Sequence, residues 1–307
     1  MSIISVTDLH KSYGSVHALK GISFNVEEGE IYGVVGPDGA GKSTLFNILT
    51  TLLLPDSGEV SVLHKDIRKD FLEIRKYIGY LPGTFSLYPD LSVEENLIFF
   101  ATMYQSSIKE NMGIIKPIWQ QLSPFKNRPA GKLSGGMKQK LALCCALIHK
   151  PILLFLDEPT TGVDPVSRKE FWEILKTIQQ QNISVLVSTP YMDEATLCDR
   201  IALLQEGQFI KMDSPQAIID SFQGNLVTLH THDIFNLLHL MEQCPFHCNF
   251  YPYGEHLHVI FYEDLTTILP SFEKFLQDNN QIYNNIQQIK PTIEDCFIEI
   301  TTEKKNL

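Results

Sequence analysis

The sequence has no long apolar run and no C-x-x-C motif. Hydrophobic residues make up 44% of the 307 residues, yet none of their runs approaches a membrane span, which needs roughly 18 apolar residues. The six cysteines show no C-x-x-C spacing, so a reduced cytosolic setting fits best. Residues 1–14 also lack the basic start and apolar segment of a secretory signal peptide. These absences predict an ordinary globular protein with an ample core.

Positive charge is scarce, especially toward the carboxyl end. The formal net charge is −11, whereas a general nucleic-acid binder is expected to be basic. From Asn225 onward there is no arginine, and 11 acidic residues face 4 lysines. We therefore expect no nucleic acid among the partners of this protein.

Two regions differ in their pattern. Residues 1–222 alternate short apolar strands with periodic helices, which is typical of an α/β domain. Strands are expected at residues 30–36, 151–157 and 182–189. The last two have apolar runs without alternation, as parallel strands buried on both faces do.

Residues 225–307 read as a small α+β module. The expected order is a strand at 225–232, a helix at 233–244, a strand pair within 249–262, a helix at 269–279 and a strand at 296–300. This order is compatible with a split βαβ arrangement.

The segment "GPDGAGKST" matches the phosphate-loop pattern G-x-x-x-x-G-K-[ST]. A strand precedes it and a helix follows, so backbone N–H groups and the helix start are expected to cradle phosphates. Lys42 is expected to reach the β- and γ-phosphates and Ser43 to ligate Mg²⁺. The alternative is a glycine-rich turn in an unrelated α/β protein. The expected nucleotide-binding residues of this loop are Gly36, Pro37, Asp38, Gly39, Ala40, Gly41, Lys42, Ser43 and Thr44.

Asp157 and Glu158 follow directly after a buried strand, in "ILLFLDEP". A carboxylate at this place suits the Mg²⁺ of a P-loop nucleotidase, so Asp157 is the second expected metal ligand. Glu158 is the expected catalytic residue, which orients or deprotonates the attacking water. The alternative is an acidic corner between a strand and a loop.

The stretch "LSGGMKQKLALCCALIHKP" is the most specific motif. Ser134 is a good helix N-cap, and two glycines follow it. Apolar residues then recur at helical spacing, so Cys144 and Cys145 are expected to pack in the core.

With these motifs and "TTGVD", residues 3–215 resemble the nucleotide-binding subunits of ATP-binding cassette (ABC) transporters. The resemblance implies a P-loop, RecA-like α/β core with an antiparallel β part and a helical subdomain at about 84–145. It also implies a head-to-tail dimer that holds two ATP molecules with Mg²⁺ between a phosphate loop and the partner's "LSGG". By this resemblance Ser134, Gly135 and Gly136 face the partner's γ-phosphate. Tyr13 stacks on adenine with Val16 beside it, and Asp164 lies at the dimer crossing, where it equally suits a helix N-cap.

The sequence departs from the family at two positions. Gly83 stands where the family has a glutamine near Mg²⁺ and the attacking water, and Pro190 stands where it has a histidine that contacts the γ-phosphate. Removing one such preorganised polar group typically slows a reaction by about 10²–10³-fold. The expectation is therefore firm ATP binding with slow hydrolysis at this subunit's own site.

The carboxyl end, "KPTIEDCFIEITTE", resembles the tail of ABC-2 type export subunits. That resemblance implies a peripheral subunit on the inner face of the cell membrane. Its implied partners are a separate membrane permease and a second ATP-binding subunit, identical or different. The main expectation is an ATPase subunit that binds and hydrolyses ATP to power the permease. The alternative is a slow-hydrolysing or binding-only regulatory half of an asymmetric heterodimer, because Gly83 and Pro190 replace the glutamine and the histidine.

The histidines of this module suggest a metal site, but their spacing fits no standard structural zinc pattern. We interpret them as polar surface residues. The residues concerned are His230, His232, His256 and His258, with Cys244, His247 and Cys248 nearby.

Overall fold

A computed structural model of the chain describes residues 1–231 and 233–303. The chain divides into two compact units, one from Met1 to Pro215 and the other from Gln216 onward. The first unit has two sheets and the second has one, and each unit has its own hydrophobic core. Within the described ranges, no helix combines the length and the apolar character that crossing a bilayer requires.

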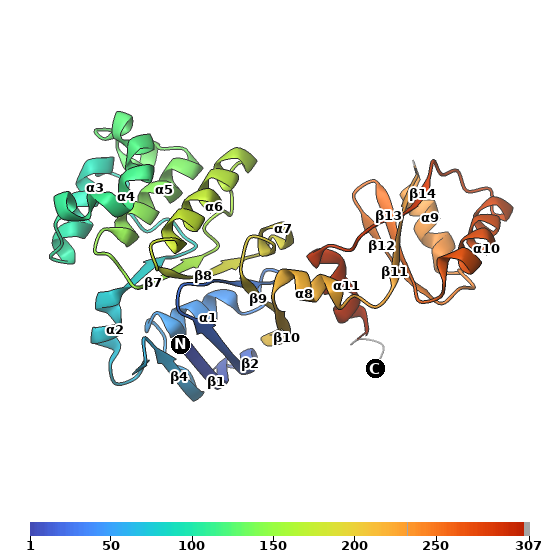
Figure 1. The fold of residues 1–307 in the computed structure, drawn as a ribbon, viewed down its shortest axis with the longest axis horizontal. Helices are drawn as coiled ribbons and strands as arrows, with labels where there is room; N and C mark the ends of the chain where they lie inside the picture. The colour runs from blue at the N-terminus through green and yellow to red at the C-terminus, as the bar shows by residue number, and fades with distance from the viewer. Residues whose placement is uncertain (232, 304–307) are drawn as a thin grey trace. The chain divides into compact units, whose positions relative to one another are not determined.

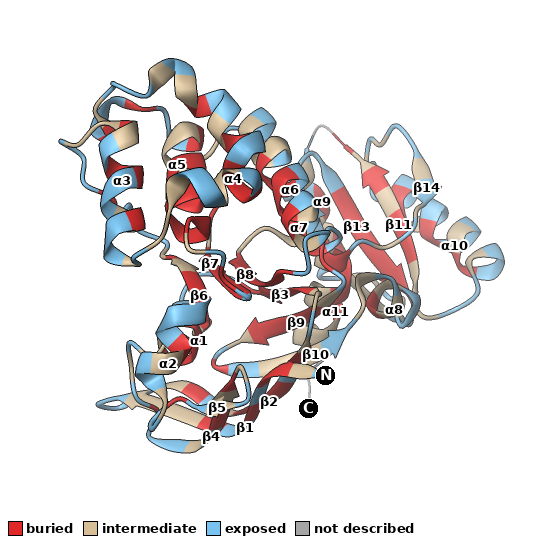
Figure 2. Ribbon diagram, turned by 60° about the vertical axis from the view of Figure 1, so that its left-hand side comes forward, coloured by how far each residue is buried: buried red, intermediate tan, exposed pale blue. Residues whose placement is uncertain are grey.

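The first unit contains a six-stranded sheet in the order β10-β9-β3-β8-β7-β6. All neighbours run parallel except the edge pair β9 and β10. Every residue of β3, β7 and β8 is buried, and Figure 2 shows this band of buried strands. The three predicted strands are therefore confirmed, with burial on both faces as their cause. The strands are β3 Ile31–Val35, β6 Ile78–Leu81, β7 Leu153–Asp157, β8 Ser184–Thr189, β9 Arg200–Gln205 and β10 Gln208–Asp213.

A second, antiparallel sheet of the same unit has the order β2-β1-β4-β5. Helix α1 lies between the two sheets (Figure 1), and its apolar residues join one core with residues of both. The helix that begins at the phosphate loop is therefore packed against both sheets. The elements are β1 Ser2–Tyr13, β2 Val16–Glu27, β4 Ser57–Val62, β5 Lys65–Asp66 and α1 Lys42–Leu49.

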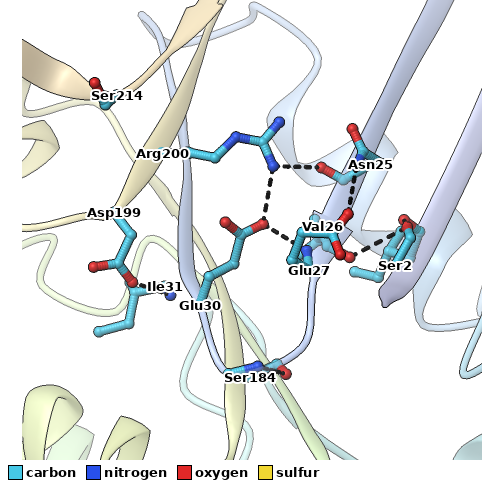
Figure 3. A network of polar contacts seen from close by, with 12 residues as sticks. Ser2, Asn25, Val26, Glu27, Glu30, Ile31, Ser184, Asp199, Arg200 and Ser214 are labelled. Atoms are coloured by element: carbon cyan, nitrogen blue, oxygen red, sulfur yellow. Dashed lines mark hydrogen bonds and ion pairs between the residues drawn. The ribbon is translucent and has the colours of Figure 1, made fainter. Parts of the chain in front are cut away.

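Polar contacts fix the ends of strands β2, β3 and β9 (Figure 3). The Glu30 carboxylate accepts from the N–H of Glu27 at 2.6 Å and pairs with Arg200 at 3.3 Å. The Asp199 carboxylate accepts from the N–H of Ile31 at 2.8 Å. Burial raises the pKa of Glu30, and the hydrogen bond from Glu27 and the charge of Arg200 oppose that rise. The two sheets are thus tied together by polar groups at their rim as well as by the core.

Helices α3 to α6 lie together on the face of the six-stranded sheet opposite α1 (Figure 1). Several of them start at residues that suit the N-cap position. Ser92 and Glu95 form a reciprocal capping box at α3, and Ser107 and Ser134 cap α4 and α5. The helices of this unit beyond α1 are α2 Phe71–Tyr77, α3 Val93–Met103, α4 Ile108–Leu122, α5 Gly135–Leu147, α6 Pro165–Gln179 and α7 Met192–Ala195, with 3₁₀ turns at Ser123–Phe125 and Ala130–Lys132.

The second unit is an antiparallel sheet in the order β12-β13-β11-β14 with helices between its strands. The chain runs β11, α9, β12, β13, α10, β14, which is the predicted split βαβ arrangement. The two predicted helices and the predicted strand pair are confirmed, whereas the short strand β14 was not predicted. The elements are α8 Pro215–Asp220, β11 Asn225–His230, α9 Ile234–Met241, β12 Cys248–Tyr253, β13 His256–Phe261, α10 Leu265–Asp278, β14 Ile286–Gln288 and α11 Ile293–Glu303.

The predicted strand at 296–300 is wrong, because these residues lie in α11. A short apolar run suits a strand or a buried helix equally. The capping box at its start decides between them: the Thr292 hydroxyl accepts from the N–H of Asp295, and the Asp295 carboxylate accepts from the N–H of Thr292. Burial then recurs at Ile293 and Cys296, three residues apart, as on one helix face.

The interpretation of the histidines as surface residues is wrong for His258, which is 5% exposed. Its Nδ1 lies 2.8 Å from a carboxylate oxygen of Asp295, which also accepts from the Tyr251 hydroxyl at 2.6 Å. The Asp295 carboxylate therefore lies at the centre of a buried hydrogen-bond network between β12, β13 and α11. His232 lies outside the described residues. The described residues hold no group of three or more His, Cys, Asp or Glu side chains that suits a metal ion.

Replacing Asp295 with asparagine should destabilise the second unit. Burial alone would raise the pKa of Asp295, but hydrogen bonds from His258, Thr292 and Tyr251 outweigh it and lower the pKa from 3.8 to about 2. The ionised form is therefore favoured by folding, so its stabilisation is complete above pH 3.8 and is lost as pH falls through about 2. We expect Asp295→Asn to lose about 2–4 kcal/mol at pH 7.

Urea unfolding of the wild-type and variant chains at several pH values measures this loss. The difference between them should shrink as the pH falls from 4 toward 2. Asp278→Asn, at an exposed position of α10, is the matched control. A loss equal to that of the control would contradict the assigned role of the carboxylate.

Candidate nucleotide-binding site

The phosphate loop connects β3 to α1, and two of its glycines are required by close contacts. A Cβ atom on Gly36 would lie 2.1 Å from the carbonyl oxygen of Leu204. Gly41 has a φ of 110°, and a Cβ there would lie 2.5 Å from the carbonyl oxygen of Ala18. Gly41 is also the N-cap residue of α1, so the first turn of the helix opens directly into the loop. Unpaired N–H groups at such a start favour anions.

Lys42 is 3% exposed and its ammonium group has four partners within the site, of which the Asp38 carboxylate is the most distant, at 3.9 Å. It donates to the carbonyl oxygens of Gly36 at 2.8 Å and Pro37 at 2.9 Å. It also lies 3.1 Å from a carboxylate oxygen of Glu158. The lysine is thus folded back over the loop, and Glu158 is its main negative partner.

The two acidic residues at the end of β7 have different surroundings. Asp157 is 4% exposed and accepts from the Ser188 hydroxyl at 2.6 Å. Burial raises its pKa, and hydrogen bonds from Ser188 and Ser43 oppose the rise. Glu158 is 21% exposed, has a φ of 49°, and donates its N–H to the Ser188 hydroxyl at 2.9 Å. Ser188 therefore holds both acidic residues, although a serine within an apolar strand carried no signal in the sequence.

A cavity of about 430 Å³ adjoins the loop. The cavity brings Tyr13 and Val16 together with the phosphate loop and Glu158. Eight of the residues that line the cavity were predicted from the sequence. Five others were missed because they come from strand β2 and from the turn between β9 and β10, where only long-range pairing places them. The predicted residues are Tyr13, Val16, Gly39, Gly41, Lys42, Ser43, Thr44 and Glu158, and the missed ones are His17, Ala18, Lys20, Glu206 and Gly207.

Eight predicted nucleotide-binding residues do not line this cavity, and neither does the expected metal ligand Asp157. The eight are Gly36, Pro37, Asp38, Ala40, Ser134, Gly135, Gly136 and Asp164. Ser134 caps α5 by accepting from the N–H of Met137 at 3.4 Å. Asp164 caps α6 by accepting from the N–H of Ser167 at 2.9 Å, which confirms the N-cap alternative and lowers its pKa. The two helix starts pack closely, since a Cβ on Gly136 would lie 2.7 Å from Ser167. Together they form a second, separate group.

Gly83 and Pro190 flank the acidic residues. A Cβ on Gly83 would lie 3.2 Å from the carbonyl oxygen of Asp157 and 3.8 Å from its carboxylate. Pro190 follows Thr189, whose carbonyl oxygen accepts from the N–H of Gly36 at 3.2 Å. Side chains at both positions therefore start beside the expected metal and phosphate sites.

The family described as "ABC transporter" matches residues 19–161. The Nod factor export ATP-binding protein I of Bradyrhizobium diazoefficiens is 31% identical over 302 residues, which cover 97% of this chain and 96% of that protein. The probable multidrug ABC transporter ATP-binding protein YbhF of Escherichia coli is 40% identical over 216 residues, which cover 70% of this chain and 37% of that protein. This chain thus aligns with little more than a third of the length of that relative.

Solved structures give the same result for the fold. The cbiO1 protein from Clostridium perfringens, described as part of the ABC transporter complex cbiONQ, is 30% identical with a TM-score of 0.64 over 72% of this chain and 91% of that chain. The ATP-binding cassette MJ0796, solved as a dimer in a post-hydrolysis state with ADP and Pi, is 27% identical with a TM-score of 0.62 over 69% of this chain and 98% of that chain. The chain therefore belongs to the ATP-binding proteins of the ABC transporter family.

Proposed function

We propose that this chain binds ATP and hydrolyses it to drive export through a separate membrane permease. The observation that carries the proposal is a cavity lined by Tyr13, Lys42, Ser43 and Glu158, with the Asp157 carboxylate interacting with Ser43. The names of the relatives, which concern multidrug transport and Nod factor export, support the exporter class. In this proposal the subunit lies at the cytoplasmic face of the membrane.

The phosphate loop binds the triphosphate. The N–H groups at the start of α1 and the Lys42 ammonium face the phosphates, and Tyr13 stacks on adenine. Lys42 is held by Glu158 at 3.1 Å in the structure. A phosphate oxygen would replace the Glu158 carboxylate as the partner of the Lys42 ammonium group. Glu158 would then be free to interact with the attacking water.

The donor set near Asp157 fits Mg²⁺. The Ser43 hydroxyl and the Asp157 carboxylate interact with each other, and both offer the hard oxygen ligands that this ion prefers. Bound there, Mg²⁺ would neutralise charge on the β- and γ-phosphate oxygens. Ser188 keeps the Asp157 carboxylate in place by donating to it at 2.6 Å.

Glu158 acts on the water that attacks the γ-phosphate. Its backbone is fixed by Ser188, and at 21% exposure its carboxylate is within reach of water. It accepts a proton from the water or orients it for in-line attack.

A second ATP-binding subunit completes the site. Ser134 and Gly135 are exposed and lie outside the chain's own cavity, next to the loop that contains Asp164. In a head-to-tail dimer they would face the γ-phosphate bound by the partner. The permease is the other protein partner, and the net charge of −11 speaks against nucleic acid.

A second candidate is a subunit that binds ATP but turns it over slowly, as half of an asymmetric dimer. The positions of Gly83 and Pro190 favour it, because neither residue offers a polar side chain beside Asp157 and the phosphate loop. The measurements below distinguish the two.

Glu158→Gln should abolish hydrolysis and keep ATP binding. The amide cannot take a proton, so we expect turnover to fall by about 10²–10⁴-fold. ATP affinity should stay equal or rise, because the amide no longer competes for Lys42. Steady-state phosphate release and binding of labelled ATP by the isolated chain measure both. Turnover unchanged by the substitution would exclude Glu158 as the catalytic residue.

Ser134→Asp should prevent ATP-dependent dimerisation without disturbing the monomer. Aspartate keeps the N-cap of α5, but its charge would repel the partner's γ-phosphate. All three chains carry Glu158→Gln and are compared by size-exclusion chromatography with ATP. The chain that keeps Ser134 and the control Ser134→Thr should elute as dimers, whereas Ser134→Asp should elute as a monomer. Dimers of equal stability in all three would contradict the proposed interface.

The double substitution Gly83→Gln and Pro190→His should speed ATP hydrolysis if the missing glutamine and histidine side chains limit its rate. We expect a rise of about 10-fold or more, since one preorganised group is worth about 10²–10³-fold. A Cβ at Gly83 would lie 3.2 Å from the carbonyl oxygen of Asp157, so the neighbouring backbone has to shift by a few tenths of an ångström to accept the new side chain. Gly113→Gln, at a position with nothing within 4 Å of a Cβ, is the control. Wild-type turnover that is already fast would exclude the slow-site candidate.

A further inference from the structure

The six cysteines all lie in the described part of the chain and fall into two groups. Four are buried, and burial raises the pKa of Cys144, Cys145 and Cys198. Cys244 and Cys248, in the second unit, are half-buried. Only these two therefore combine a neighbouring thiol with access to solvent.

Cys244 and Cys248 stand at a junction between a helix and a strand. Cys244 lies three residues after the end of α9, and its N–H donates to the carbonyl oxygen of Met241 at 3.0 Å. Cys248 is the first residue of β12, an edge strand of the sheet. Their sulfur atoms are 3.8 Å apart, with the Cys248 thiol donating to Cys244. Rotation of the side chains has to close less than 2 Å to reach the about 2.05 Å of a disulfide.

We propose that Cys244 and Cys248 form a reversible disulfide that links the end of α9 to the edge strand β12. Cys244 is the attacking thiol and Cys248 the resolving thiol. The modification belongs to the second unit and does not depend on the ATP site of the first.

The electrostatics favour this division of roles. The hydrogen bond from Cys248, together with one from the backbone at Phe246, outweighs burial and lowers the pKa of Cys244 from 9 to about 7. The same hydrogen bond raises the pKa of Cys248. Cys244 is therefore the thiolate near neutral pH, and the thiolate is the reactive form.

The oxidant is a low-molecular-weight disulfide of the glutathione class. The Cys244 thiolate attacks one of its sulfurs, so a mixed disulfide forms and one thiolate leaves. Cys248, once deprotonated, attacks the Cys244 sulfur and releases the second thiolate. Two protein thiols are oxidised, one small disulfide is reduced to two thiols, and the reverse exchange restores the pair.

A metal site is a poorer fit for the same pair. The described residues include no third His, Cys, Asp or Glu that would complete a metal-binding group with it. His247 packs instead against the ring of Tyr262, with centroids 5.1 Å apart.

The test uses the full native chain with oxidised glutathione at pH 7, followed by acid quenching, alkylation and peptide mass spectrometry. We expect a Cys244–Cys248 disulfide that reduced glutathione reverses, while the four buried cysteines stay unmodified. Cys248→Ser should trap glutathione on Cys244. Cys244→Ser should acquire glutathione on Cys248 about 5-fold more slowly, because the higher thiolate fraction of Cys244 outweighs its lower nucleophilicity.

Three results would overturn the proposal. The first is native protein without the internal disulfide after exposure to the oxidant. The second is equal rates of glutathione attachment in the two single variants. The third is stoichiometric retention of Zn²⁺ by the wild type that both variants lose, since the pair would then be a ligand set. The wild-type mapping needs no variant, so it stands even where a serine disturbs folding.

Discussion

The side-by-side alignment of β3, β8 and β7 is the constraint on which the rest of the first unit depends. These strands run parallel, with Val35 beside Thr189 and Ser188 beside Asp157. Their carboxyl ends therefore meet at one edge of the sheet, where ligands of α/β proteins bind. The phosphate loop continues from β3, the acidic pair from β7 and Pro190 from β8. One register thus brings together segments more than a hundred residues apart in the sequence.

The same arrangement explains how a charged lysine is tolerated in the protein interior. An unpaired buried ammonium group would destabilise the fold by several kcal/mol. Lys42 at 3% exposure is matched by two carbonyl oxygens and by Glu158. These contacts keep the cation in place without a ligand, and a phosphate has only to replace one carboxylate. The fold therefore preorganises the site for an anion.

What the sequence could predict depended on whether a pattern had one structural solution. The glycines and lysine of the phosphate loop had one, whereas a short apolar run suits a strand or a buried helix, and the strand was right for β7 and β8. The run at 296–300 suited strand or helix, and the capping partnership of Thr292 with Asp295 that decides it was overlooked. His258 and Ser188 were missed for another reason: their roles come from Asp295 and Asp157, 37 and 31 residues away. Pairings of that range cannot be read from local sequence.

The glycines of the site differ in what requires them. Gly36 and Gly41 are fixed by the backbone, since a Cβ would lie 2.1 and 2.5 Å from carbonyl oxygens. At Gly83 the nearest such atom is 3.2 Å away and the φ angle is not positive, so a side chain there needs a shift of only a few tenths of an ångström. The backbone therefore constrains Gly83 less strictly than it constrains Gly36 and Gly41. In the proposed mechanism, loop geometry, Lys42 and the acidic pair hold the nucleotide, whereas Gly83 and Pro190 would affect the rate of the step that follows. On that proposal, binding and turnover would vary independently on this scaffold.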